Sequence, residues 1–194
     1  MKIFFRCDVQ QRRGFILLNS LVLLLILTIL AVGLFKMVGE QHHVTAAMRD
    51  KQLAVTNALS AEQYAEWWVL QGSGAANTGV CTTTATTSTA MVCTNPLVAP
   101  VTLPWTALDS SGTAQNVGVT YVPPANLLNI STSGGANVVY ASPGFYVQYA
   151  GPSADGQGIL YQINAYGYGG AADSVGVVQD TYEVTSGVVN RGGL

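Results

Sequence analysis

Charge is what this chain lacks most. Lys, Arg, Asp and Glu together make up 9% of its 194 residues, against about a quarter in an average globular protein. Between Phe15 and Phe35 there is no charged residue at all. The balance is slightly acidic, with a formal net charge of −2. Composition therefore gives no sign of an electrostatic surface for nucleic acid.

Histidine is also scarce, and this bears on enzymatic function. The only two histidines, His42 and His43, are adjacent. Neighbouring residues on a helix point about 100° apart, so we expect a solvated face here and no metal site. No other histidine could act as the base of a Ser or Cys triad. The carboxylates of the body are scattered in the sequence: Asp109, Asp155, Asp173, Asp180 and Glu183. We therefore expect no catalytic, metal or cofactor site and no enzymatic activity.

A short basic head precedes the charge-free run. Residues 1–14 carry four cations against one anion, a net charge of +3, from Lys2, Arg6, Arg12 and Arg13 against Asp8. The run that follows is 21 residues long, counted from Phe15 to Phe35, and about 20 apolar residues suffice to cross a bilayer. Because Lys and Arg stay on the cytoplasmic side, the C-terminal body is expected to face outward.

The head has three possible meanings. It could belong to an ordinary secretory signal, since Ala31-x-Gly33 is similar to a small-residue cleavage site. It could be a permanent signal anchor. It could also be cut between Gly14 and Phe15, which would leave the apolar run in the mature protein. The continuity of helical pattern across residues 30–45 argues against the ordinary signal, because cleavage there would leave an amphipathic helix without its apolar half.

Cysteine usage agrees with an exported body. Cys7 lies in the head, which leaves Cys81 and Cys93 as the only pair in the body. An even pair in an exported domain indicates a disulfide, and a loop of this length would contribute about 3 kcal/mol. The alternative is two free, buried thiols.

Beyond the apolar run the chain continues to favour helix. From Lys36 to about Leu70 there is no proline, and Gly39 is the only glycine. Apolar residues recur near helical spacing, with polar residues on the other side. These features predict one helix from about Phe15 to Gln71.

That helix has two parts, apolar all round over 15–36 and amphipathic over 37–71. Gly72-Ser73-Gly74 is a typical helix stop. Near that end, Trp67 and Trp68 are expected to pack on the domain.

The rest of the body predicts a connector followed by a sheet. Residues 72–116 show no clear hydrophobic period and include the Thr-rich stretch 82–89. We therefore expect an exposed loop that is crosslinked by the disulfide. Residues 117–189 favour an antiparallel meander with one buried and one wetter face. Its expected strands are Val117–Val122, Val138–Ala141, Phe145–Ala150, Ile159–Tyr166 and Val175–Val184.

These elements predict an α+β fold, in which one long helix packs through its outer half on an antiparallel sheet. Gly167-Tyr168-Gly169-Gly170 is faintly similar to a phosphate-binding loop. It lacks a following helix aimed at a ligand, so we interpret it as a turn or a strand-end glycine cluster.

The arrangement of Arg13-Gly14-Phe15, an apolar helix, an amphipathic continuation and an outer sheet resembles type IV pilins and pseudopilins. More narrowly, three segments are similar to PilX-type minor pilins: RGFILLNSLVLLLILTILAVGLFKMV, MRDKQLAVTNALSAEQYAE and YQINAYGYGGAADSVGVVQDTYEV. The resemblance implies a cytoplasmic leader over 1–14, a membrane and assembly segment over 15–36, and a periplasmic domain over 37–194. It also implies that a prepilin peptidase cleaves after Gly14 and methylates Phe15.

Asn19 departs from the family pattern. It occupies the fifth mature position, where most pilins carry a Glu that is thought to pair with the N-terminal amine of a neighbouring subunit. Both charges are costly in an apolar environment unless paired, and Asn19 cannot compensate a buried ammonium. Its neutrality disfavours efficient methylation of Phe15, and it is consistent with a subunit that enters the filament first.

The resemblance implies a structural function: a minor pilin that helps to start pilus assembly in a tip complex. Its implied partners are other minor pilins, the major pilin, the assembly platform, a tip adhesin, the peptidase and, before assembly, membrane lipid. One alternative is a surface-binding module, an adhesin or DNA-contacting pilin that uses the loop between Cys81 and Cys93. Another is the tip pseudopilin of a type II secretion system, although relatives of that kind usually carry a large inserted domain.

Overall fold

A single helix, α1, runs from Gln10 to Leu70 over 61 residues. The computed structural model describes residues 10–72, 77–123, 128, 130–133 and 138–185. The helix predicted from about Phe15 is confirmed along its length, although it begins five residues earlier, at Gln10. The helix ends at the predicted glycine stop. Gly72 has a φ of 72°, and its N–H donates to the carbonyl of Val69 at 3.2 Å. A glycine in this left-handed conformation is a common helix terminator.

The chain divides into an N-terminal unit, Met1–Ala47, and a C-terminal unit, Met48–Leu194. Residues of α1 belong to both. In the N-terminal unit the described side chains, at 15–39 and 41–47, are all exposed. The C-terminal unit contains the sheet and both hydrophobic cores.

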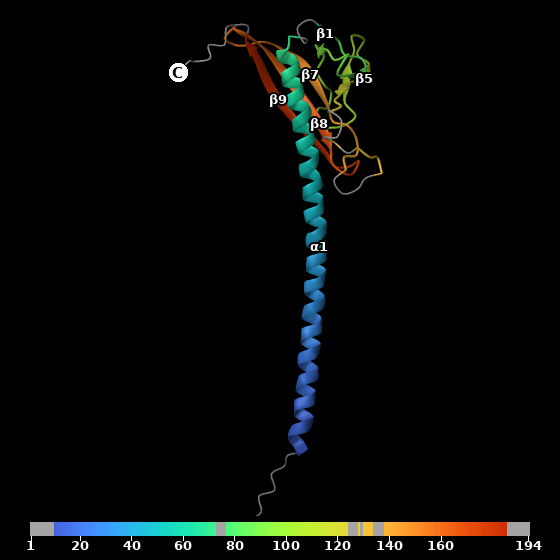
Figure 1. Cartoon of the computed structure of the whole chain (residues 1–194), viewed down its shortest axis with the longest axis vertical. Helices are drawn as coiled ribbons and strands as arrows, with labels where there is room; N and C mark the ends of the chain where they lie inside the picture. Colours follow the sequence, from blue (N-terminus) through green and yellow to red (C-terminus); the bar gives the residue numbers. More distant parts are fainter. Residues whose placement is uncertain (1–9, 73–76, 124–127, 129, 134–137, 186–194) are drawn as a thin grey trace, which may run out of the picture. The chain divides into compact units, whose positions relative to one another are not determined.

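Three long strands form the antiparallel meander predicted from the sequence. They are β7 (Gly144–Pro152), β8 (Gly158–Tyr168) and β9 (Val175–Thr185). β8 pairs with β7 on one side and with β9 on the other, and the β8–β9 register runs unbroken from Gly158↔Thr185 to Tyr168↔Val175. Figure 1 shows these three strands as one orange-to-red sheet.

Shorter strands make the sheet mixed, so the prediction of a purely antiparallel sheet was wrong. β3 (Val92–Cys93) runs parallel to β7, and β1 (Thr78–Gly79) runs parallel to β3. β6 (Gly118–Thr120) is antiparallel to β7, and β2 (Thr84–Thr86) is parallel to β6. Strands of two or three residues are too short to give a period-2 pattern, which is why 72–116 looked like a plain connector.

The predicted strand Val138–Ala141 was also wrong. Only Val139 pairs there, in an isolated bridge with Ile130. The expected strand Val117–Val122 is reduced to the three residues of β6.

The first hydrophobic core lies between α1 and one face of the sheet. The helix contributes Ala61, Ala65, Trp68 and Val69 to it. Phe145, Val147, Tyr161 and Ile163 face them from the sheet.

Glycines allow the close approach of α1 to the sheet. Gly167 on β8 pairs in register with Gly176 on β9. A Cβ on Gly167 would lie 2.5 Å from the carbonyl oxygen of Ala54, and one on Gly176 would lie 2.7 Å from the backbone nitrogen of Val55. The interpretation of Gly167 as a turn or strand-end glycine was therefore incomplete, because its place inside β8 is a contact with helix backbone.

Polar side chains fix the register of α1 on the sheet. Asn57 Nδ2 donates to the carbonyl of Tyr168 at 2.9 Å. Lys51 Nζ donates to the carbonyl of Val175, and the Asp50 carboxylate accepts the N–H of Gly170. These contacts hold the helix at the point where β8 ends and β9 begins.

A second core covers the opposite face of the sheet. It gathers Cys81, Cys93, Trp105 and Ala107 from the presumed connector, together with Val117 and with Tyr146 from β7. The hairpin of β4 (Thr106–Leu108) and β5 (Ala114–Asn116) belongs to this layer. Tyr146 and Asn164 are each 1% exposed, so the expected wet face of the sheet is covered. The connector is thus a third layer of the domain.

Candidate functional site

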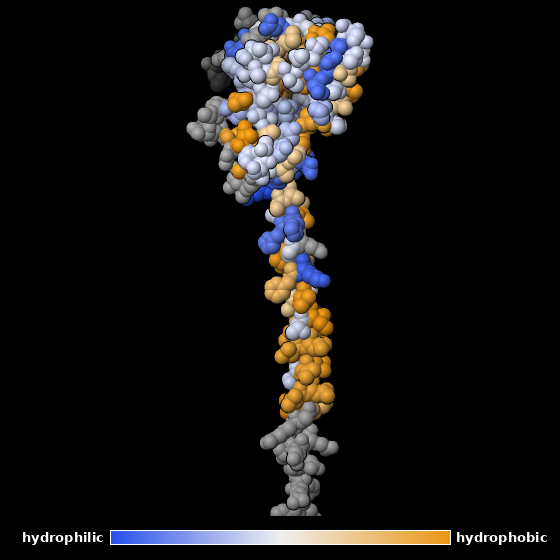
Figure 2. All heavy atoms as spheres, turned by 90° about the vertical axis from the view of Figure 1, so that its right-hand side faces the viewer, coloured by the Kyte–Doolittle hydropathy of each residue, from blue (hydrophilic) through white to orange (hydrophobic). Residues whose placement is uncertain are grey.

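The largest exposed apolar region is the stretch of α1 from Phe15 to Phe35, called here the N-terminal apolar surface. Its large side chains are between 45% and 78% exposed, with Val22 and Phe35 at the two extremes. Figure 2 shows this stretch as an orange surface. Its aliphatic side chains include the following six, which are 52–68% exposed: Leu17, Leu18, Leu21, Leu24, Leu25 and Ile29.

One helix, taken as Phe15–Leu70, is long and apolar enough to cross a membrane by its length and composition. Contiguous exposed apolar surface of this extent requires a lipid or protein partner. This agrees with the anchor predicted from the sequence. Residues 1–9 of the expected leader lie outside the described residues, and Gly14 lies within α1.

Asn19 differs from the other polar residues of this surface. Ser20 Oγ donates to the carbonyl of Leu17, and Thr28 Oγ1 donates to that of Leu25, each at 2.8 Å. Both hydroxyls are therefore satisfied by their own helix. Asn19 is exposed, and within the part of the chain that the structure describes its amide has no hydrogen-bond partner. The amide is available to a group outside the chain.

The pair Cys81–Cys93 forms the predicted disulfide, with Cα atoms 5.3 Å apart. The alternative of two free thiols was wrong. Both cysteines are almost fully buried, at 6% and 3% exposure. Their second-core packing explains why a segment without regular pattern is nevertheless ordered around them.

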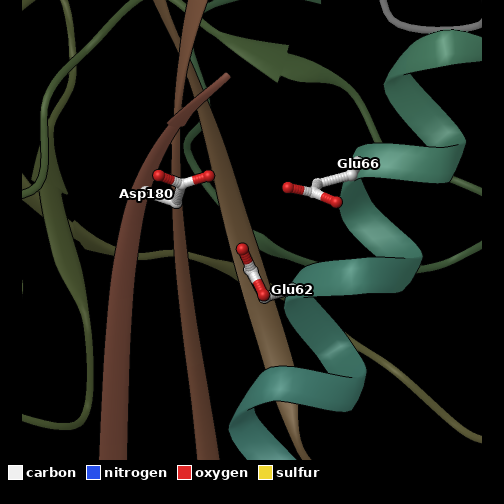
Figure 3. A group of neighbouring side chains, drawn as sticks. All are labelled: Glu62, Glu66 and Asp180. Atoms are coloured by element: carbon white, nitrogen blue, oxygen red, sulfur yellow. The ribbon is translucent and has the colours of Figure 1, made fainter.

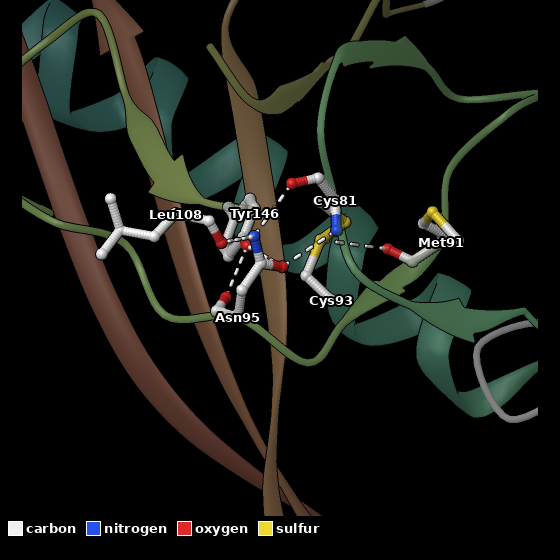
Figure 4. Close-up of a disulfide and its surroundings, with 6 residues drawn as sticks. All are labelled: Cys81, Met91, Cys93, Asn95, Leu108 and Tyr146. Carbon is white, nitrogen blue, oxygen red and sulfur yellow. Dashed lines mark hydrogen bonds between the residues drawn. A yellow bond between two sulfur atoms is a disulfide. The ribbon is translucent and has the colours of Figure 1, made fainter. Parts of the chain in front are cut away.

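Asn95 organises the region around the disulfide, as Figure 4 shows. Its Oδ1 accepts the N–H of Cys81 at 2.9 Å, and its Nδ2 donates to the carbonyls of Cys81 and Leu108 at 2.9 and 3.0 Å. The Tyr146 hydroxyl donates to the carbonyl of Asn95 at 2.6 Å, and burial raises the pKa of that hydroxyl. A lone asparagine near a cysteine is not a recognisable sequence motif, so sequence reasoning missed Asn95.

A small hollow lies beside the disulfide, within the Thr-rich stretch. Its volume is about 140 Å³, and its lining includes Thr82, Thr83, Thr84, Thr89 and Met91. Thr82, Thr83 and Thr84 are exposed, as expected for a solvated segment. The hollow carries hydroxyl groups and no charged side chain.

The two neighbouring tryptophans of α1 have different environments. Trp68 is 7% exposed and packs near Phe145, whereas Trp67 is 52% exposed. The expectation that both pack on the domain was wrong for Trp67, because adjacent helical residues face different directions. Trp67 instead borders Tyr64, with ring centroids 5.5 Å apart.

The carboxylates are less scattered than the sequence suggested. Glu62 and Glu66 of α1 and Asp180 of β9 each place an oxygen within 4.8 Å of the others. Burial raises the pKa of the Glu62 carboxyl, and the charges of Glu66 and Asp180 raise it further. The i, i+4 spacing of the two glutamates was the available signal, but no sequence pattern connects them with Asp180.

The two histidines lie on a solvated helix face, as predicted. His42 and His43 are exposed. Asp109 and Asp155 lie at turns, where they accept N–H groups of Ser111 and Gln157 at 2.9 and 3.0 Å.

Comparison with known proteins gives no match to the chain, whether among protein-family models, curated proteins or solved structures. The likeness to type IV pilins thus stays a prediction from the residues of α1 and the C-terminal segment. The coarser result is an α+β fold with one long N-terminal helix and a mixed sheet.

Proposed function

We propose that the protein is a structural minor pilin of a type IV pilus, which helps to start assembly in a priming complex at the tip. The observation that carries the proposal is the N-terminal apolar surface. It has no charge over 21 residues, and no described side chain of the chain covers it. Such a surface can lie in lipid before assembly and against other helices afterwards. Packing must favour the second state, since lipid tails are as apolar as leucine.

Asn19 gives the proposed position in the filament. A subunit in the shaft needs an anion to compensate the N-terminal ammonium of its neighbour, because an unpaired charge in an apolar environment is costly. Asn19 offers an amide, which can hydrogen-bond but not neutralise. The first subunit has no such ammonium to neutralise, so the loss of the carboxylate is tolerable there.

The proposed path has three stages. The chain is held in the inner membrane by 15–36, with its C-terminal domain in the periplasm. A prepilin peptidase removes residues 1–14 after Gly14. The mature subunit then joins other minor pilins and the assembly platform, and the major pilin follows beneath them, with a possible adhesin at the tip.

Processing is tested by intact mass and N-terminal sequencing of the protein made with and without a prepilin peptidase. We expect a mature chain that starts at Phe15, and Gly14→Val should block the cut. Gly33→Ala, a glycine change within the apolar surface, should leave processing unchanged. A mature N-terminus at Met1 in the presence of active peptidase would contradict the proposal.

Position is tested by immunogold labelling of pili and by deletion. A null strain should make few pili, and label on complemented strains should lie at pilus ends. Asn19→Glu should move label into the shaft, because it restores the missing carboxylate. Normal piliation in the null strain, or shaft labelling of the wild type, would overturn the tip assignment.

The Thr-lined hollow favours a second candidate, a surface-binding module. Loops held on a rigid scaffold often carry recognition, and this one is held by the Cys81–Cys93 disulfide. If it is the functional element, replacing 82–92 abolishes attachment to surfaces or DNA while pilus number stays normal. A loss of both together favours the priming function.

A further inference from the structure

Three carboxylates meet where α1 crosses β9. Glu62 and Glu66 lie four residues apart on one face of the helix, and Asp180 reaches toward them from the strand. Figure 3 shows the three carboxylates directed at the same space, and one oxygen of each lies within 4.8 Å of the others. Like charges this close repel one another, so a cation placed between them would stabilise the folded state.

Glu62 adds an independent observation. Its side chain is 8% exposed, and among the described residues no donor reaches its carboxylate. Its oxygens still reach solvent, but a largely buried carboxylate without a donor or a counter-charge among the described residues is unfavourable. Its carboxylate is aimed into the space shared with Asp180 rather than outward.

The domain does not supply the missing cation from its described residues. In the C-terminal unit these include two basic side chains, Arg49 and Lys51. They precede Glu62 by 13 and 11 residues, which is roughly 20 and 16 Å along a helix axis. Lys51 is already bonded to the carbonyl of Val175. Neither side chain spans that distance.

We propose that Glu62, Glu66 and Asp180 form a binding site for one Ca²⁺ ion. The donors are all oxygen, which suits a hard cation and not zinc. Two oxygens bonded to the same Ca²⁺ at about 2.4 Å can lie up to about 4.8 Å apart, and the three oxygens here lie within that distance of one another. Waters on the exposed side, where Asp180 lies, complete the six to eight ligands that Ca²⁺ takes. Mg²⁺ demands a regular octahedron, which an arrangement of two helical residues and one strand residue does not offer.

The ion would tie α1 to the outer strand of the meander. β9 pairs with β8 alone among the described strands, so its other edge has no partner there. The Ca²⁺ site would hold that edge strand against the helix some three turns beyond the contacts of Asp50 and Lys51. The inference is independent of the pilin proposal, because it concerns the C-terminal unit by itself.

The test is calcium binding to the full-length protein in detergent micelles at pH 7, after treatment with a chelator. Isothermal titration with CaCl₂ is carried to about 10 mM, above the dissociation constant of roughly 1 mM that weak extracellular sites reach. We expect one ion per chain, with at least a tenfold weaker affinity in Glu62→Gln and Asp180→Asn. Glu183→Gln is the matched control, since it removes one charge from the opposite face of the same strand and should bind Ca²⁺ like the wild type.

Unfolding gives a second readout. CaCl₂ should raise the thermal midpoint of the wild type and of Glu183→Gln, whereas MgCl₂ should raise it less and NaCl of equal ionic strength should not raise it. Asp180 is exposed, so Asp180→Asn tests the site even if Glu62→Gln impairs folding. The proposal is overturned if the wild type takes up no Ca²⁺, if Asp180→Asn binds as tightly as the wild type, or if Glu183→Gln loses as much affinity as Asp180→Asn.

Discussion

The two halves of α1 differ in the size and the exposure of their apolar side chains. From Phe15 to Phe35 the helix carries large side chains that are about half to three-quarters exposed. Over 54–65 its fully buried apolar positions are all alanines: Ala54, Ala58, Ala61 and Ala65. Large aliphatic groups therefore lie where no described residue covers them, and alanines lie where the sheet is closest.

This difference separates assembly from folding. Alanine facing glycine lets the helix backbone approach the strands, and the domain needs no external partner to bury that face. Leucine in the first half provides surface area that can be used only with lipid or with another subunit. Substitutions in the first half should thus alter membrane or filament contacts, and substitutions in the second half should alter the stability of the domain. All three tryptophans lie in the C-terminal unit, so their fluorescence reports unfolding of that unit alone.

Replacing glycine by alanine should have different consequences on the strand that packs against the second half of α1 and within its first half. Gly167→Ala places a Cβ against backbone atoms of Ala54, Asn57 and Ala58, which cannot move aside as a side chain can. We expect a loss of at least about 3 kcal/mol in the free energy of unfolding, the upper end for overpacking. Urea unfolding of the full-length protein in micelles, followed by tryptophan fluorescence, measures it.

Gly33→Ala is the matched change in the exposed half. A Cβ at Gly33 has no neighbour within 4 Å, and alanine favours helix over glycine by about 1 kcal/mol. The fluorescence midpoint should stay at the wild-type value. A shift of equal size in both variants would show that the halves do not differ as described.

Loss of the disulfide should lower the stability of the C-terminal unit and leave the N-terminal unit unchanged. Cys81→Ser with Cys93→Ser removes a crosslink between residues 12 apart in sequence, and a loop of this size contributes about 3 kcal/mol. The second core should loosen, so that the fluorescence midpoint moves to lower urea, while far-UV circular dichroism retains the helix of the N-terminal unit. Reduction of the wild type by dithiothreitol should reproduce the shift. An unchanged midpoint would mean that the Asn95 and Tyr146 contacts hold this layer without the crosslink.

The contrast between halves also explains what sequence reasoning could achieve. The long helix, the three long strands and the disulfide all left strong local signals, such as an uncharged run, alternation along Tyr161–Ala165 and an isolated pair of cysteines. The third layer left none. Its strands are two or three residues long, and its order depends on Trp105 and Tyr146, which meet only in the folded chain.

The candidate site residues also divide into those close together in the sequence and those that meet only in the folded chain. Gly14, Phe15 and Asn19 are neighbours in sequence, so their arrangement could be predicted. Asp180 is 118 residues from Glu62 in the sequence, and only the crossing of α1 over β9 brings them together. Gly167 was interpreted incompletely for the same reason, since the backbone atoms that it accommodates belong to a helix distant in sequence.

Two asparagines of α1 offer a smaller test of the comparison. Asn57 is 4% exposed and donates to the carbonyl of Tyr168 at 2.9 Å, so Asn57→Ala leaves a carbonyl without its partner. We expect a loss of about 1–3 kcal/mol in the free energy of unfolding. Asn19→Ala, in the exposed half, should leave that value unchanged. If Asn19→Ala lowers it as much, the N-terminal apolar surface contributes to the stability of the domain.

The smallest expected effect is a pH dependence confined to the C-terminal unit, because no side chain from Phe15 to Phe35 titrates. Hydrogen bonds from Ser111, Thr113 and Gln115 lower the pKa of Asp109 from 3.8 to about 2. A lowered pKa means that the folded state holds the proton less tightly than the unfolded state. The stabilisation is therefore complete above pH 3.8 and is lost as the pH falls toward 2.

Thermal midpoints measured by tryptophan fluorescence between pH 2 and 5, the window set by that pKa shift, should fall less steeply for Asp109→Asn than for the wild type. The direction follows because asparagine has no proton to gain in the folded or the unfolded state. Ser111→Ala keeps the carboxylate but removes the contact that lowers its pKa most, so its profile should lie between the other two. Equal slopes in all three proteins would mean that the turn at Asp109 does not couple to the second core, and that the acid sensitivity of this unit has its origin elsewhere.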